Sequence, residues 1–222
     1  GLSISGFPVE LPAIVASEMA AADLNNDGYS EIILGLNNGY LYVYDYTGNE
    51  FEGFPVEIGS SISSGITVLD NKKIAVGTTD NRLLLFSQSG EILFELPING
   101  KIANSPVLGD INNDNSVDIV FSTSNGYIYA VNQNGTILPN FPVSISSSVS
   151  YPPLIADIDG DNSLDIIVVN YLSNLYVFDS SGNLAEFTPI INNQNSTTPS
   201  SIADIDNDGD LEIIFGLDIG VL

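Results

Sequence analysis

Short apolar runs separated by polar turns recur along the whole chain, and their spacing never follows the three-to-four-residue period of an amphipathic helix. Continuous apolar runs occupy residues 32–34, 74–76, 119–121, 166–169 and 213–215, and the pattern alternates over residues 40–44, 127–131 and 175–178. Continuous runs of this length are typical of strands buried on both faces. The pattern therefore predicts an all-β protein.

Two markers repeat along the chain with one period. A short Pro motif occurs as Phe7-Pro8-Val9, Phe54-Pro55-Val56, Leu96-Pro97-Ile98, Phe141-Pro142-Val143 and Thr188-Pro189-Ile190, at steps of 47, 42, 45 and 47 residues. An Asp that follows a small or apolar stretch occurs at Asp23, Asp70, Asp110, Asp157 and Asp204, at steps of 47, 40, 47 and 47 residues. Because the two markers are independent, we infer a tandem repeat.

Each repeat unit has the pattern of four short strands. The first ends at the marker Asp, the second is the continuous apolar run, the third alternates and the fourth carries the Pro motif. Proline cannot donate to a strand ladder, so the fourth strand is expected at the sheet edge. A Gly in the turn before it supplies positive φ. Four antiparallel strands per unit predict the four-stranded blades of a β-propeller. A β-sandwich is the alternative, but it would not require the same markers in every unit.

The chain is expected to form a single propeller domain of about five blade-equivalents. Residues 1–12 correspond to an edge strand, four blades span about 13–58, 59–100, 101–145 and 146–191, and residues 192–222 correspond to an incomplete blade. Two readings stay open. The N-terminal strand completes the last blade of a closed five-bladed ring, or the chain is a fragment of a larger propeller.

The composition excludes several classes of function. The 222 residues include 28 acidic and 4 basic side chains, a formal net charge of −24, and neither His nor Cys. A His-based acid–base pair, a thiol nucleophile, a Cys/His zinc site and a disulfide frame are therefore impossible. Nucleic acid and anionic membrane surfaces are not expected as partners, because phosphate binding depends on Lys and Arg. No apolar run approaches the roughly 18–20 residues that span a bilayer, so no membrane insertion is expected.

Four of the five marker Asp residues open a nine-residue acidic loop. We call them the first (23–31), second (110–118), third (157–165) and fourth (204–212) loops, and count positions from the marker Asp. Side-chain oxygens stand at positions 1, 3, 5 and 9: Asp23, Asn25, Asp27 and Glu31; Asp110, Asn112, Asp114 and Asp118; Asp157, Asp159, Asp161 and Asp165; Asp204, Asp206, Asp208 and Glu212. Position 7 would add a backbone carbonyl, from Tyr29, Ser116, Ser163 and Asp210.

Oxygen-only donors from a flexible loop are the ligands that Ca²⁺ prefers. Position 6 is Gly or Asn in every loop, as a tight left-handed turn requires. Ordinary turn chemistry explains Gly and Asn but not the repeated acids, and the loops hold 15 of the 28 acidic residues. An EF-hand is excluded because position 12 is apolar instead of a bidentate Glu. The pattern predicts about four Ca²⁺ ions.

The second repeat unit lacks this loop. It runs Asp70-Asn71-Lys72-Lys73-Ile74, with Lys73 where the ninth-position acid would stand. Two readings remain: Lys72 or Lys73 places a fixed positive charge where other blades hold a metal, or the segment is a solvated basic turn.

The loop sequence Asp-x-Asp/Asn-x-Asp-Gly/Asn-x-x-Asp/Glu resembles the FG-GAP/VCBS-type repeats of integrin α-chain propellers and of many secreted microbial surface proteins. The resemblance implies calcium ions in the hairpin loops between the first and second strands, on one face of the ring. Proteins with these repeats include adhesion modules, carbohydrate binders and propeller domains of polysaccharide lyases, so the resemblance leaves function open.

The expected function is a calcium-stabilised, non-catalytic binding or adhesion module for protein or carbohydrate, located outside the cell or on its surface, where calcium sites are commonly weak. One alternative is the propeller domain of a polysaccharide lyase, with Lys72, Lys73, Arg82 and Lys101 as its cations. Another is an assembly role through unpaired strands at the two ends. Tyr40, Tyr42, Tyr44, Tyr127, Tyr129 and Tyr176 are expected to pack between blades, whereas Tyr29, Tyr151 and Tyr171 are the candidates for exposed sugar-binding rings.

Overall fold

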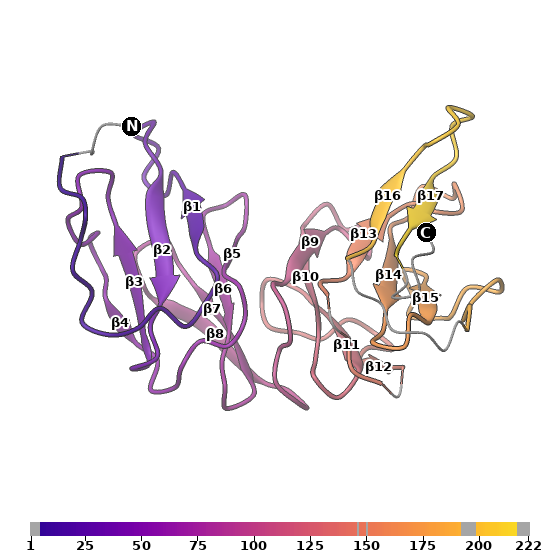
Figure 1. The fold of residues 1–222 in the computed structure, drawn as a ribbon, viewed down its shortest axis with the longest axis horizontal. Coiled ribbons are helices and arrows are strands. Elements are labelled where there is room, and N and C mark those ends of the chain that lie inside the picture. Colours follow the sequence, from indigo (N-terminus) through magenta and orange to yellow (C-terminus); the bar gives the residue numbers. More distant parts are fainter. Residues whose placement is uncertain (1–4, 146, 150, 192–198, 217–222) are drawn as a thin grey trace. The chain divides into compact units, whose positions relative to one another are not determined.

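A computed structural model describes residues 5–145, 147–149, 151–191 and 199–216 (Figure 1). The regular structure of this part is β-strand throughout, arranged in five antiparallel sheets. The chain divides into two compact units, Gly1–Ser105 and Pro106–Leu222, which are described separately. The all-β prediction is confirmed.

The N-terminal unit contains two four-stranded sheets, each with its strands in chain order. The first sheet comprises β1 (Ala20–Ala22), β2 (Glu31–Gly35), β3 (Tyr40–Tyr44) and β4 (Val56–Glu57). The second sheet comprises β5 (Thr67–Val68), β6 (Ile74–Gly77), β7 (Arg82–Phe86) and β8 (Ile92–Pro97). This order of four antiparallel strands is the predicted blade.

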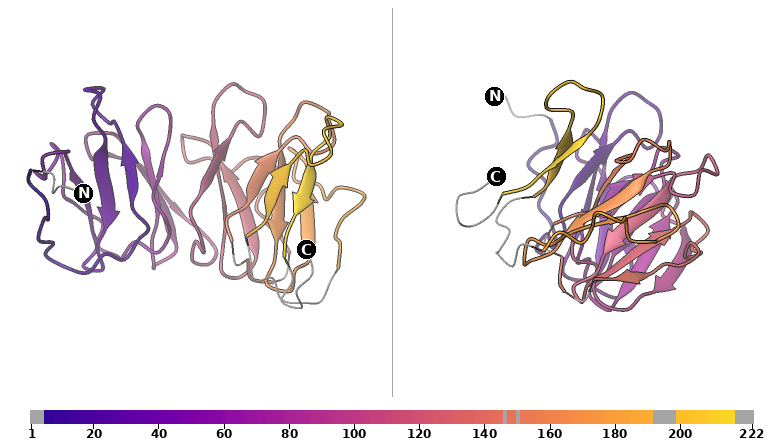
Figure 2. Two further views of the ribbon diagram at one scale, coloured as in Figure 1. Left: turned by 45° about the horizontal axis from the view of Figure 1, so that its top comes forward. Right: turned by 90° about the vertical axis from the view of Figure 1, so that its right-hand side faces the viewer.

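The C-terminal unit contains the other three sheets, and Figure 2 shows β16 and β17 beside the sheet that contains β13 and β14. The third sheet comprises β9 (Val107–Gly109), β10 (Asp118–Ser122), β11 (Tyr127–Val131) and β12 (Val143–Ser144). The fourth sheet comprises β13 (Leu154–Ala156), β14 (Asp165–Val169) and β15 (Leu175–Phe178), and the fifth comprises β16 (Ser201–Ala203) and β17 (Glu212–Ile214). Within the described residues, the last two sheets are therefore smaller than a four-stranded blade.

In the first four sheets the continuous apolar run lies in the second strand and is buried on both faces, apart from the half-buried Ile32, whereas the residues of β17 in the fifth sheet are half-buried. In β2, Ile33 belongs to a core cluster shared with the second sheet, and Leu34 belongs to a cluster on the opposite face. All five residues of β10 and of β14 are buried. The prediction from the apolar pattern is confirmed, because a strand between two packed layers has no solvated face.

The core consists of layers between successive sheets within each unit. In the N-terminal unit, Val43 of β3 packs in one cluster with Val76 and Leu84 of the second sheet. In the C-terminal unit, one cluster joins the third and fourth sheets, and another joins Val169 of β14 to Ile213 of β17. Successive sheets packed face to face are the internal arrangement of propeller blades.

The Pro motif lies where an edge strand was predicted. β4 begins directly after Pro55, β12 begins directly after Pro142, and both strands are outermost in their sheets. Residues 5–12 form no strand, but Val9 and Leu11 pack against the cluster that contains Leu34. The remainder of the predicted edge strand, residues 1–4, and most of the predicted incomplete blade, residues 192–198 and 217–222, lie outside the described residues.

Candidate metal centres

The four acidic loops connect the first and second strands of four sheets, as expected. In each, the residue before the marker Asp pairs with the ninth-position acid: Ala22 with Glu31, Gly109 with Asp118, Ala156 with Asp165 and Ala203 with Glu212. The ninth-position acid is thus always the first residue of the second strand. This register closes all four hairpins in the same way, so one loop conformation recurs.

The marker carboxylate folds each loop around itself. In the first loop, Asp23 Oδ1 accepts from the N–H of Asp27 at 3.2 Å, and Oδ2 accepts from the N–H of Gly28 at 3.0 Å. The equivalent pairs of hydrogen bonds occur at Asp110, Asp157 and Asp204. Two backbone donors therefore converge on the marker carboxylate in each loop and hold the loop in its conformation.

Positions 4 and 6 both have left-handed backbone conformations. The expected turn at position 6 is present, with φ of 90° at Gly28 and 66° at Asn115. Position 4 shares this conformation, with φ of 61° at Asn26 and 75° at Gly160. Sequence reasoning missed position 4, although its signal was present, because the four residues there are Asn or Gly, which tolerate positive φ.

The ninth-position carboxylate is buried in the first three loops and half-buried in the fourth. One of its oxygens accepts from the N–H of position 2, at 2.7 Å in the first loop, 3.1 Å in the second, 2.9 Å in the third and 2.7 Å in the fourth. Glu31 and Asp118 are completely buried, and their other oxygens, Glu31 Oε1 and Asp118 Oδ1, have no hydrogen-bond partner. A buried carboxylate oxygen without a partner destabilises a fold unless a cation compensates its charge.

Burial changes the protonation of these acids. It raises the pKa of Asp118 to about 6, against the hydrogen bond from Ile111 and with a further contribution from the charges of Asp114 and Asp110. Burial likewise raises the pKa of Glu31 and of Asp165. In the first three loops the ninth-position carboxylate is thus buried beside other acids, and both effects oppose its ionisation. A divalent cation relieves this electrostatic condition.

Carboxylate oxygens converge at positions 1, 3 and 9. In the third loop those of Asp157, Asp159 and Asp165 lie within 4.8 Å of one another, and in the fourth loop those of Asp204, Asp206 and Glu212 do so. The first two loops have Asn at position 3, so an amide oxygen replaces one carboxylate. The position 5 carboxylate is not part of either cluster, and its Oδ1 instead accepts from the N–H of position 7 in all four loops.

The donor set fits a hard cation. Positions 1, 3, 5 and 9 of each loop carry four side chains with oxygen donors, and no His or Cys is present to add a nitrogen or sulfur ligand. Two loops contain a buried oxygen that nothing in the described protein satisfies. Oxygen-only sets of this kind suit Ca²⁺ or Mg²⁺ better than transition metals. The clusters can therefore hold a metal ion.

The second sheet has a short turn in place of the acidic loop. The N–H of Leu69 donates to the carbonyl of Lys73 at 2.9 Å, and Lys72 adopts a φ of 66°. Asp70 is the one acidic residue between β5 and β6, so this turn offers no carboxylate cluster. Whether a lysine charge substitutes for a metal here stays a prediction.

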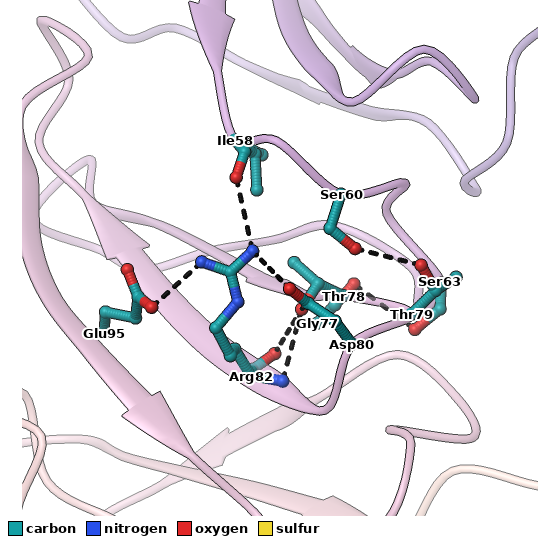
Figure 3. A network of polar contacts seen from close by, with 9 residues as sticks. All are labelled: Ile58, Ser60, Ser63, Gly77, Thr78, Thr79, Asp80, Arg82 and Glu95. Carbon is teal, nitrogen blue, oxygen red and sulfur yellow. Dashed lines mark hydrogen bonds and ion pairs between the residues drawn. The ribbon is translucent and has the colours of Figure 1, made fainter.

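Arg82, one of the basic candidates, is paired with two acidic neighbours (Figure 3). Its guanidinium lies 2.7 Å from Asp80 and 2.9 Å from Glu95, and it also donates to the carbonyl of Ile58 at 3.2 Å. Lys72 precedes β6 and Arg82 follows it, so the two lie at opposite ends of that strand. The structure therefore does not bring Lys72 and Arg82 together into one cationic site.

The tyrosines separate into buried and exposed groups. Tyr42 and Tyr44 are buried in the cluster that Val9 and Leu11 also join, and Tyr129 is buried and stacks on Phe121. Tyr40, Tyr127 and Tyr176 are half-buried. The predicted exposed rings are Tyr29, Tyr151 and Tyr171, and the structure exposes the first and third but leaves Tyr151 half-buried. A further exposed ring, Tyr46, was missed because its partner, Tyr29, is distant in sequence.

No helix in the described part of the chain has the length and apolar character needed to cross a membrane.

A family model for the FG-GAP-like repeat matches residues 110–168 and 157–215. Each match begins at the marker Asp of an acidic loop, so the repeat of the family model starts at the same residue as the repeat inferred from the sequence pattern. No curated protein matches the sequence.

Solved structures show the same fold. The chain superposes on BBS1N in complex with ARL6DN with a TM-score of 0.65 and 13% identity over 96% of its length, covering 62% of that chain. For BamB from Moraxella catarrhalis the TM-score is 0.63, the identity 18%, and the coverage 91% of this chain and 59% of that chain. For the V. cholerae biofilm matrix protein Bap1 the TM-score is 0.63 and the identity 20%, and the match covers 84% of this chain and 30% of that chain.

The chain thus spans about 60% of the first two structures and less of the third. BBS1N and BamB are β-propeller proteins, which agrees with the blade-like sheets described above. At these identities the likeness concerns the fold alone. Together, the acidic loops and the family match identify residues 110–215 as FG-GAP-like repeats, in a chain with the fold of a β-propeller.

Proposed function

We propose that the chain is a calcium-stabilised extracellular module that binds a protein or carbohydrate and has no catalytic activity of its own. The observation that carries the proposal is the buried carboxylate oxygen of Glu31 and of Asp118 that lacks a partner inside a loop of oxygen donors. A cation bound there would satisfy this oxygen and offset the repulsion between the acids.

The proposed ligands are the side-chain oxygens of positions 1, 3, 5 and 9 and the carbonyl of position 7 in each loop. Bound calcium would supply positive charge and would hold the end of the first strand next to the start of the second. The same loop occurs four times, which favours a structural role, because a catalytic ion would be expected at one specialised site. Four structural ions also explain how a chain of charge −24 remains compact.

The extracellular location follows from the expected strength of the sites. Calcium sites in extracellular modules commonly have dissociation constants of roughly 10⁻⁴–10⁻³ M, and such sites fill outside the cell but not in a resting cytosol. The repeats resemble those of secreted and surface proteins, which supports the same location.

A binding role is favoured over the lyase alternative by the state of the basic residues. A lyase acting on acidic polysaccharide needs a cation near its base to offset the substrate carboxylate. Arg82 is already paired with Asp80 and Glu95, and Lys72 lies at the other end of β6. Loops carried on a rigid scaffold are instead a common way to present a binding surface.

The proposal is tested by thermal melting in EDTA and in a calcium series, with magnesium as the control ion. At a free concentration ten times the dissociation constant, each site adds about 1.4 kcal/mol, so four sites add ~6 kcal/mol. For a chain of this size the expected rise in Tm is on the order of 10–20 °C. An identical Tm in EDTA and in calcium would contradict the proposal.

A further inference from the structure

Two exposed tyrosine rings stack on each other beside the first acidic loop. The ring centroids of Tyr29 and Tyr46 are 4.1 Å apart with an angle of 20° between the planes, and the residues are 54% and 43% exposed. Tyr29 is position 7 of the first loop, and Tyr46 lies in the turn that follows β3. Because β2 and β3 are antiparallel, with Ile32 opposite Tyr44, the loop and the turn lie at the same end of the first sheet.

A hollow of about 450 Å³ opens at this end of the sheet. Its walls come from Leu24 and Asn25 of the first loop, from residues 51–53 and from Gln88 and Ser89 in the corresponding turn of the second sheet. The volume is within the range of roughly 300–1,000 Å³ that small-ligand sites occupy. The first loop contributes Leu24 and Asn25 to the walls of the hollow and Tyr29 to the stacked rings.

The walls of the hollow are fixed by close packing. A Cβ added at Gly53 would collide with the backbone carbonyl of Ser89, so the two turns touch through their main chains. Asn25 is held as well, because its Nδ2 donates to Asp27 Oδ2 at 3.0 Å. Bound calcium would immobilise the first loop further. A site assembled before the ligand arrives loses less entropy on binding.

The lining chemistry indicates which ligand fits. Gln88 offers a whole amide group, Glu52 a carboxylate and Ser89 a hydroxyl, and none of the lining residues is basic. Asn25 adds the second N–H of its amide, because its oxygen is a proposed calcium ligand and its first N–H donates to Asp27. Amides and carboxylates pair with neighbouring hydroxyl groups, and aromatic rings pack against apolar faces of a ligand. The side chains that line the hollow would offer an anionic sugar no positive charge, and the net charge of −24 would repel it.

From this juxtaposition we infer that the hollow and the Tyr29–Tyr46 pair form a binding site for a neutral oligosaccharide. The inference rests on the proposed function as a binding module and narrows its ligand class. A sugar ring packs on the exposed face of the tyrosine pair, and the hydroxyl groups of the adjoining sugar reach the amides and the carboxylate in the hollow. The role of the Tyr46 ring is separate from metal binding, since only the backbone carbonyl of Tyr29 is a proposed calcium donor.

The test is isothermal titration with calcium present, using neutral tetrasaccharides of glucose, mannose and galactose, tetragalacturonate as the anionic sugar and tetralysine as the cationic peptide. Wild type is compared with Tyr46→Ala, Gln88→Ala and the control Tyr171→Ala, whose ring is 51% exposed in the C-terminal unit. The melting temperature of every sample is measured with and without calcium, so that folding and metal binding are judged separately.

We expect at least one neutral tetrasaccharide to bind wild type, and Tyr46→Ala to weaken its affinity by about tenfold, the loss typical of an aromatic contact. Tyr171→Ala should leave the affinity within about twofold, and all variants should keep the calcium-induced shift.

Binding that Tyr46→Ala and Gln88→Ala leave unchanged would overturn the site while the binding module stands. Binding of tetralysine or tetragalacturonate alone, or of none of the probes, would overturn the ligand class. Loss of the calcium-induced shift in wild type would instead contradict the proposed function.

Discussion

Replacing Asp118 by Asn separates the two roles assigned to the ninth-position acid, a buried charge in the free loop and a ligand in the loaded loop. Asn has nearly the same shape, and its Oδ1 can still accept the hydrogen bond that Ile111 donates at 3.1 Å. The substitution therefore removes the charge while it preserves the packing of a fully buried side chain.

The expected magnitude follows from the pKa. Burial raises the pKa of Asp118 from 3.8 to about 6, so its ionised form destabilises the metal-free fold at neutral pH by up to about 3 kcal/mol. In EDTA the Asp118→Asn variant should be more stable than wild type by as much as this amount. Calcium then favours wild type by about 1.4 kcal/mol at ten times the dissociation constant and about 2.7 kcal/mol at a hundred times.

The assay is urea unfolding of both proteins at neutral pH, in EDTA and at increasing calcium. The advantage of Asp118→Asn should be largest in EDTA and should almost disappear at high calcium. Asp70→Asn is the matched control, because Asp70 is an exposed acid in the corresponding turn of the sheet that lacks an acidic loop, and its effect should not depend on calcium. A variant that is less stable than wild type in EDTA, or an advantage that calcium leaves unchanged, would refute the reasoning.

Two further substitutions probe the backbone and the ion pairs. Gly53→Ala should lower the free energy of unfolding by about 1–3 kcal/mol more than Gly59→Ala, measured in urea, because both residues have positive φ but only at Gly53 would a Cβ collide with backbone, that of Ser89. Burial opposes ionisation of Asp80, but hydrogen bonds from Arg82 and Thr78 prevail and lower its pKa to about 2. Asp80→Asn should therefore be less stable than wild type above pH ~4, and the difference should vanish as pH falls through about 2; a difference that persists in acid would contradict this.

The strands and the loops could be predicted from the sequence because both are set by local pattern. Continuous apolar runs became second strands buried on both faces, and the Gly or Asn at position 6 adopts the expected left-handed conformation. The left-handed conformation at position 4 is also set by local sequence, and the Asn and Gly residues at that position would have allowed its prediction.

Contacts between distant residues were beyond such reasoning. The sequence indicated that positions 1, 3, 5 and 9 carry oxygens, but not that position 5 would instead accept from the N–H of position 7. The pairing of Arg82 with Glu95 across β7 and β8, and the stacking of Tyr29 on Tyr46, depend on strand register, which fixes neighbours only after the sheet has formed.

The count of bound calcium ions tests the central claim most directly. Equilibrium dialysis of the metal-free chain against calcium, with the bound ion measured by atomic emission, gives this number without any assumption about stability. We predict a saturating value close to four ions per chain, one for each acidic loop, falling by one in a variant in which the marker acid of a single loop is replaced, Asp157→Ala. A chain that binds no calcium, or that keeps its full complement of ions in this variant, would contradict the assignment of the loops as metal sites.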